Sequence, residues 1–140
     1  MTLENLIEDY LSGQEDQILV SDSHRSVTRK DFSQLVYSNV DKLTQLWSGR
    51  VRAERGVAIL LKRNVDYIAV IFASWMAGGY YLPLNVDSPK ELAASHIEKS
   101  RVSVVVTATG PDNSPKFTFK KSVSETAGRE QNHQFENIDL

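Results

Sequence analysis

One segment of the chain has the residue types of a phosphate-binding loop. It runs from Thr107 to Lys116 and contains threonine and serine hydroxyls, one glycine and a final Pro-Lys pair. A phosphate cradle needs consecutive small residues whose backbone N–H groups converge on the anion, usually with a helix amino terminus behind them. Pro111 removes one of those donors, and Asp112 adds a negative charge where phosphates would lie. The sequence therefore predicts a loop here that does not bind phosphate.

The three histidines do not have the spacing of a metal site. His24 lies between two extended runs and is expected to be solvated. His96 shares a helical stripe with Leu92 and Ile97, which favours a packed or partly buried side chain over a metal ligand. His133 lies in a polar tail. Acidic residues near the amino terminus are expected to form a solvated face: Glu4, Glu8, Asp9, Glu15 and Asp16. The sequence thus predicts no catalytic residue and no metal ligand.

The composition is that of one ordinary globular domain. With 41% hydrophobic and 24% charged residues, 140 residues are enough to bury a core. We expect residues 1–140 to form a single domain in which 109–140 are rich in loops. A net charge of -2 gives no basic footprint for nucleic acid or membrane headgroups. The absence of cysteine excludes disulfides and fits a reducing cytoplasm, where we expect the protein to reside.

One uncharged stretch, 67–84, has the length of a short membrane span. Gly78, Gly79 and Pro83 interrupt it, so a span is not predicted. The amino terminus is acidic and amphipathic, which is typical of neither a secretory signal nor a transit peptide.

The first fifty residues predict a helix, a hairpin and a second helix. Apolar residues at helical spacing predict a helix over 3–11, with Thr2 as its cap and Gly13 beyond its end. Turn-forming residues between 17–21 and 25–28 predict a β-hairpin. Thr28 is the expected cap of a long helix that ends at Gly49, with Asp31 three residues after the cap.

The middle of the chain alternates strands and helices. A continuous apolar run over 56–61 predicts a strand that is buried on both faces. The next helix, over 64–76, is apolar nearly all round, so two of its sides are expected to be buried. Gly78 and Gly79 can adopt the positive φ that ends this helix. Ser88 is the expected cap of a further helix that runs to about Lys99. The remaining predicted elements are the helix 64–76, strands at 80–84, 102–107 and 116–120, and a final strand or tail at 134–140.

This alternation predicts an α/β fold. Strands that are joined through a helix run parallel, and successive crossovers place helices on both faces of the sheet. We therefore expect a parallel-strand sheet with helices on both faces, preceded by a short helix and the hairpin.

The segment Trp75–Asn85, with Pro89 further on, resembles a core motif of the adenylate-forming (AMP-binding) enzymes. The segment reads Trp-Met-Ala-Gly-Gly-Tyr-Tyr-Leu-Pro-Leu-Asn. The usual form of the motif is Leu-Lys-Ala-Gly-x-Ala-Tyr-x-Pro-Leu-Asp followed by Tyr-Pro. Tyr80 replaces a small residue and Asn85 replaces the aspartate of peptide synthetases. Thr28, Asp31 and Phe32 also resemble the family's first motif, Leu-Thr-Tyr-x-Glu-Leu, where Arg29 replaces the tyrosine.

The resemblance covers about Ile18 to Thr107 and implies the amino-terminal subdomain of a much longer enzyme. Family members include acyl-CoA synthetases and the adenylation domains of nonribosomal peptide synthetases. Such an enzyme activates a carboxylic acid with ATP and Mg²⁺ to an acyl-adenylate and passes the acyl group to a thiol of CoA or a carrier protein. The family's phosphate loop, magnesium-binding Thr-Glu pair, ribose-binding Asp and mobile Lys have no counterpart in the sequence. This segment alone is therefore expected to bind no cofactor and to be inactive.

The resemblance also points to Asn85 and Asp87 as cofactor-binding residues. Some CoA-forming members carry Asn-Pro-Arg here, with the arginine near a CoA phosphate, whereas peptide synthetases tend to carry Asp-Pro-Asp or Asp-Pro-Ser. Asp87 would repel a phosphate by about 1 kcal/mol at roughly 4 Å in water, which favours a carrier-protein thiol. Alternatively, Asp87 only interacts with the dipole of the next helix.

Two further expectations concern what the chain is and whether it associates. It is either an amino-terminal piece of an adenylating ligase or a stand-alone, non-catalytic α/β binding or regulatory module. Coding DNA that continues past Leu140 into a phosphate-loop motif would indicate the former. If a later part of the enzyme normally covers the second side of the helix 64–76, the isolated chain exposes an apolar patch and forms a homodimer.

Overall fold

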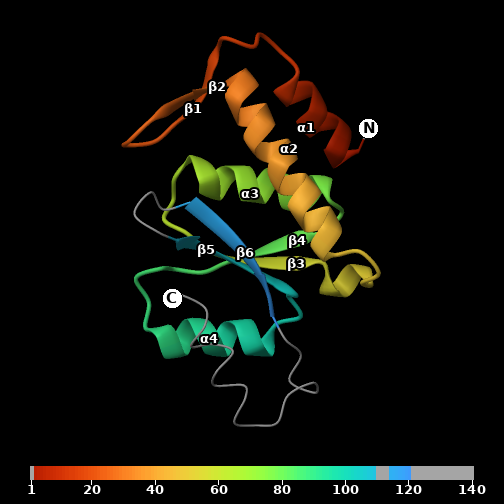
Figure 1. The fold of residues 1–140 in the computed structure, drawn as a ribbon, viewed down its shortest axis with the longest axis vertical. Coiled ribbons are helices and arrows are strands. Elements are labelled where there is room, and N and C mark those ends of the chain that lie inside the picture. Colours follow the sequence, from red (N-terminus) through yellow and green to blue (C-terminus); the bar gives the residue numbers. More distant parts are fainter. Residues whose placement is uncertain (1, 110–113, 121–140) are drawn as a thin grey trace.

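The computed structural model describes residues 2–109 and 114–120 (Figure 1). The predicted final strand or tail and His133 lie outside these residues. In chain order the elements are α1 (Leu3–Leu11), β1 (Ile18–Ser21), β2 (Ser26–Thr28), α2 (Arg29–Leu46), the short 3₁₀ helix η1 (Arg52–Glu54), β3 (Gly56–Leu60), α3 (Val65–Met76), β4 (Tyr80–Pro83), α4 (Lys90–Lys99), β5 (Val104–Thr109) and β6 (Ser114–Phe119). The predicted α/β fold, with its amino-terminal helix and hairpin, is confirmed.

The amino-terminal helix is held at both ends. Thr2 caps α1 as predicted, because its Oγ1 accepts the Asn5 N–H at 3.2 Å. At the other end, the Arg29 guanidinium donates to the Tyr10 and Gln14 carbonyl oxygens, both at 2.9 Å. These are backbone acceptors just inside and beyond the last turn of the helix. The arginine that departs from the family motif therefore attaches α1 to the start of α2.

The hairpin and α2 follow the predicted boundaries closely. β1 and β2 pair antiparallel, and Thr28 Oγ1 accepts the Asp31 N–H at 3.2 Å, as a helix cap does. The helix ends at Leu46 rather than at Gly49, so the predicted end was too late. Trp47 turns into the core with 2% of its surface exposed, and Gly49 follows with φ 79° in the turn.

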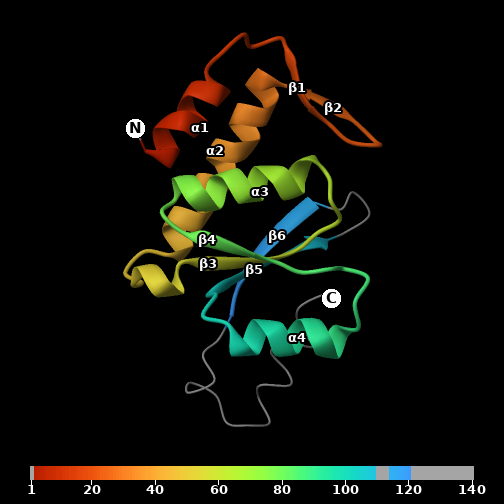
Figure 2. The same ribbon diagram turned by 180° about the vertical axis from the view of Figure 1, so that it is seen from behind.

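The main sheet has the strand order β4-β3-β5-β6. β3 lies parallel to β4 and to β5, as predicted, whereas β6 pairs antiparallel with β5. β5 starts two residues later than predicted and runs on to Thr109, and β6 starts at Ser114 rather than at Lys116. Helices α2 and α3 lie over one face of the sheet, α1 packs on these two helices on the side away from the sheet, and α4 covers the other face (Figures 1 and 2).

Side chains along β3 alternate between two cores. Val57 and Ile59 pack under α1, α2 and α3, whereas Ala58 and Leu60 pack under α4. All five residues of the strand are buried, which confirms the reading of this apolar run. Burial of one such aliphatic side chain is worth about 1.5–3 kcal/mol relative to exposure.

Helix α3 is buried on two sides, as its composition predicted. Its first turn is capped by Asn64, whose Oδ1 accepts the Tyr67 N–H at 3.0 Å. On the side away from the sheet it packs against α1 and α2, where Phe72 contacts the rings of Tyr10 and Phe32 edge-on. α1 and α2 of the same chain cover part of this second side, while Ile71, Trp75 and Met76 stay partly exposed. The homodimer stays a prediction.

The two glycines after α3 have different roles. Gly78 has φ 81° and ends the helix as predicted. Gly79 does not have positive φ, so that part of the prediction is wrong. A Cβ at Gly79 would instead overlap the Arg55 carbonyl oxygen and the Trp47 ring. Only glycine allows this close approach between the turn and the end of α2.

Helix α4 differs from the prediction in two respects. It begins at Lys90 with Pro89 at its cap position, so Ser88 is not the cap. The Ser88 N–H donates to the Asn85 carbonyl oxygen and so belongs to the preceding turn. His96 is exposed rather than packed, because α4 buries only the narrow stripe of Ala93 and Ile97 against the sheet.

Lys120 holds the carboxyl end of α4 against the sheet. Its Nζ donates to the carbonyl oxygens of Ile97, Glu98 and Ser100, at 2.6, 3.3 and 2.8 Å. They are carbonyl oxygens at the end of the helix, of which that of Ile97 also accepts from the N–H and the Oγ of the cap residue Ser100. In the part of the chain that the structure describes, no helix is long and apolar enough to cross a membrane.

Candidate ligand pocket at the carboxyl ends of the strands

A pocket of about 420 Å³ lies beyond the carboxyl ends of β3 and β4. Ligands of open α/β sheets bind at this end of the strands. The pocket contains both residues that the sequence singled out, Asn85 and Asp87. Its lining residues come from two loops: Leu61, Lys62, Arg63, Leu84, Asn85, Val86 and Asp87.

The wall after β4 is shaped by a turn that Asn85 forms with its own backbone. The Leu84 N–H donates to the Ile59 carbonyl oxygen at 3.1 Å, which extends the pairing of β3 with β4. Asn85 Oδ1 then accepts the Asp87 N–H at 2.9 Å, which is the short-range bond of an Asx turn. Asn85 therefore holds the loop in shape, and Asp87 lies exposed at the pocket, two residues before the cap of α4.

The wall after β3 carries two cations on a well-anchored loop. Leu61 is buried, and Lys62 and Arg63 are exposed directly after it. Asn64 then caps α3, and Asp22 Oδ2 accepts the Val65 N–H at 2.9 Å. Because these bonds occupy N–H groups of the helix start, the positive charge of the pocket comes from the two side chains rather than from the helix.

Asp22 connects the hairpin to this wall. Its carboxylate accepts N–H groups from Val65, His24 and Arg25, and these three bonds lower its pKa to about 2. Arg25 also forms an ion pair with Asp66 at 2.9 Å. The sequence predicted Asp22 only as a turn residue. Its bond to a residue 43 positions later has no local signal.

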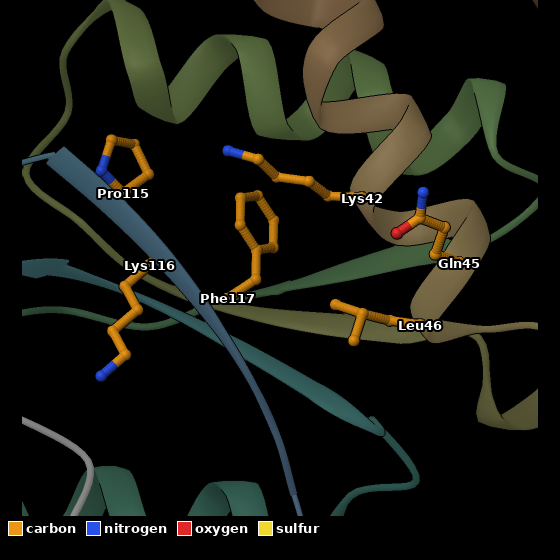
Figure 3. A pocket seen from close by; sticks show the side chains of 6 residues that line it. All are labelled: Lys42, Gln45, Leu46, Pro115, Lys116 and Phe117. Atoms are coloured by element: carbon orange, nitrogen blue, oxygen red, sulfur yellow. The ribbon is translucent and has the colours of Figure 1, made fainter.

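The segment 107–116 has the residue types of a phosphate-binding loop, and its described residues belong to the antiparallel strands β5 and β6. Thr107 and Lys116 lie opposite each other in the antiparallel pair β5–β6, and residues 110–113 are outside the described ones. A groove of about 440 Å³ separates β6 from α2, where the Lys42 amine lies 5.5 Å above the Phe117 ring. The Lys116 side chain extends away from this groove (Figure 3). Thr107 is buried in the sheet, with 3% of its surface exposed, so its hydroxyl is not available to a ligand in the surface groove.

The described residues contain no cluster of metal-ligating side chains. Within 2–109 and 114–120, no group of three or more His, Cys, Asp or Glu side chains could hold a metal ion. His24 lies at the tip of the hairpin and His96 on the exposed side of α4, which are distant parts of the fold (Figure 1).

The chain belongs to the AMP-binding enzyme family, whose model matches residues 7–138. Among curated proteins it is 30% identical over 118 residues to the dapdiamide synthesis protein DdaD of Enterobacter agglomerans, covering 83% of this chain and 19% of that protein. It is 31% identical over 101 residues to the mitochondrial malonate–CoA ligase ACSF3 of Bos taurus, covering 70% and 17%. The chain therefore spans less than a fifth of the length of these relatives.

Solved structures show the same fold. A four-domain nonribosomal peptide synthetase bound to AMP and glycine superposes with a TM-score of 0.67 at 22% identity, over 96% of this chain and 10% of that one. A second peptide synthetase, bound to an α-methyl-L-serine adenylate, gives a TM-score of 0.66 at 20% identity over 75% and 12%. The resemblance found in the motif at Trp75–Asn85 is confirmed.

Proposed function

We propose that the protein is the amino-terminal part of an ATP-dependent ligase that activates a carboxylic acid. The ligase would convert the acid and ATP to an acyl-adenylate and pyrophosphate, and would then transfer the acyl group to a thiol. The observation that supports this most strongly is the family match over residues 7–138. Relatives whose names describe a CoA ligase and a lipopeptide synthase agree with this reaction class.

We assign a supporting role to the described residues, which would not adenylate on their own. They provide the sheet, its helices and one ligand pocket. The pocket contains two cations, one carboxylate and one amide, and this set has no evident nucleophile held by a base. ATP and Mg²⁺ would be bound by other parts of the longer enzyme.

The thiol is proposed to be that of a carrier protein rather than of free CoA. Asp87 lies at the pocket, at the position where some CoA-forming members of the family carry an arginine, and a carboxylate there disfavours a highly charged nucleotide. Asn85 contributes by fixing the position of Asp87 through the Asx turn.

Acid-dependent exchange of pyrophosphate into ATP tests the proposal. We expect none from the purified 140-residue chain, and we expect exchange from the product of a gene that continues past Leu140 into a phosphate-loop motif. Exchange by the 140-residue chain would contradict the supporting role. A stop codon after Leu140, with no adenylation motif downstream, would favour the rival interpretation of a stand-alone binding or regulatory module.

A further inference from the structure

Strand β6 forms one edge of the main sheet, and its outer side is open in the part of the chain that the structure describes. The Lys120 N–H donates inward, to the Ser103 carbonyl oxygen at 2.7 Å. Because the backbone groups of an extended antiparallel strand alternate in direction, the N–H and C=O groups of Phe117 and Phe119 point to the open side. Pro115 follows the same alternation, so its missing N–H costs no bond to β5. This edge can accept a further strand.

Both faces of the β6 edge are cationic. The amine of Lys42, from α2, lies 5.5 Å above the Phe117 ring in the groove of about 440 Å³ between α2 and β6. Lys116 projects to the other face of the sheet (Figure 3). Both lysines are exposed, and neither forms an ion pair with a carboxylate of the described residues. A second copy of β6 would add its own lysines to the same edge, so the edge favours an acidic strand.

The segment 134–140 has the charge pattern that fits this edge. It reads Gln-Phe-Glu-Asn-Ile-Asp-Leu and contains two carboxylates and no basic residue. Glu136 and Asp139 are an odd number of positions apart, so an extended strand directs them to opposite faces of a sheet. One carboxylate would therefore meet Lys42 and the other would meet Lys116.

The apolar residues of the segment decide which face each carboxylate takes. Ile138 and Leu140 fall on the same face of an extended strand as Glu136. On the α2 side of the edge, the groove is lined by the half-buried side chains of Leu46 and Phe117. Burial of the aliphatic side chains against this groove favours the orientation in which Glu136 lies on the α2 side.

We propose that residues 134–140 add to the open edge of β6 as a further strand of the main sheet, with Glu136 beside Lys42 and Asp139 beside Lys116. The connection is long enough: a chain of the length of 120–133 spans up to roughly 45 Å, against about 20 Å for a strand as long as β6. The added strand covers an edge that would otherwise pair with other chains. This proposal does not depend on the proposed ligase activity.

A spin label on the segment tests the proposal in the 140-residue chain. The sequence contains no cysteine, so Asn137→Cys creates a single attachment site. We expect the label to cause loss of the amide signals of 114–119 and 42–46, and to leave those of β4, at the opposite edge of the sheet, largely intact. Equal loss at both edges, or loss at neither, would overturn the proposal. Loss in a mixture of labelled chain with isotope-enriched, unlabelled chain would mean that a second copy supplies the segment, and would also overturn it.

Charge reversal identifies the contacts. Lys42→Glu should reduce the broadening at 114–119 about twofold or more, because an attractive pair becomes a repulsive one. Adding Glu136→Lys should restore the broadening to the Lys42→Glu variant. The control Lys30→Glu changes the charge equally at an exposed position at the start of α2 and should have no effect. Equal reductions in both lysine variants would mean that only net charge matters and would contradict the pairing.

A proline tests whether the backbone of the segment pairs with β6. Ile138→Pro lacks an N–H and does not fit a paired strand, so it should abolish the selective broadening. It should also accelerate hydrogen exchange at Phe117 and Phe119 about tenfold or more, with the amide shifts of β3 unchanged. Ile138→Val, which suits a strand, is the matched control and should behave as the wild type does. Full broadening in the proline variant would overturn the added strand.

Discussion

The two faces of the sheet differ in how much they bury. Among the described residues, the face under α1, α2 and α3 buries seventeen apolar side chains in one cluster, whereas the face under α4 buries six. The pocket lies where these two regions meet. Its cationic wall continues into α3, which Asn64 and Asp22 hold in place, and its Asp87 wall leads into α4. One wall therefore belongs to the strongly packed region and the other to the weakly packed one.

Adjacent residues of β3 provide a matched test of this difference. Ile59→Ala should destabilise the protein by about 3–5 kcal/mol, because the large cluster around this fully buried side chain cannot collapse into the cavity. Leu60→Ala should cost about 2–3 kcal/mol, since Leu60 keeps 6% exposure and has fewer neighbours that would lose contacts. Denaturant unfolding of both variants measures the difference. An equal loss, or a larger loss for Leu60→Ala, would contradict the difference between the two faces.

Lys120→Met should loosen α4 while leaving the other face unchanged. Methionine keeps an apolar stem but cannot donate to the three carbonyl oxygens of Ile97, Glu98 and Ser100. Because water reaches this position, we expect a loss of only about 1 kcal/mol. Hydrogen exchange should accelerate in α4 and β6 and stay constant in α3. Lys99→Met, an exposed lysine in the last turn of the same helix, is the control.

Asp22→Asn should remove a pH-dependent attachment of the hairpin to α3. The folded-state pKa of Asp22, about 2, is below its ordinary value of 3.8. The carboxylate therefore stabilises the fold fully above pH 3.8, and this stabilisation is lost as the pH falls towards 2. Thermal unfolding from pH 6 to pH 2 should show a gap between wild type and variant that closes in this window. A gap that does not vary with pH would mean that the charge of Asp22 is not involved.

Residue patterns along the chain predicted most of the elements, although the local cap signal at Ser88 was wrong. Thr2 and Thr28 are predicted caps a few residues from their partners, and the apolar run of β3 indicates that both of its faces are buried. The wrong prediction for His96 also came from a local signal. Helical spacing places it on an apolar stripe, but only tertiary packing determines how much of that stripe the sheet covers.

Contacts between distant residues could not be predicted from such patterns. Asp22 to Val65 and Arg29 to Tyr10 join separate elements through side chains that also suit a solvated turn or helix surface. The pocket is a similar case. The family motif pointed to Asn85 and Asp87, but nothing in their neighbourhood showed that Lys62 and Arg63 lie across from them. That arrangement depends on β3 and β4 being parallel neighbours whose carboxyl ends meet.

Native-state hydrogen exchange tests the contrast between the two faces most directly. Amides of β3 and α3 should exchange only through global unfolding, with opening free energies equal to the total stability. Amides of α4 should exchange through a smaller, local opening with a lower free energy and a weaker dependence on denaturant. Equal opening free energies in α3 and α4 would contradict the account, because they would mean that both faces unfold as one unit.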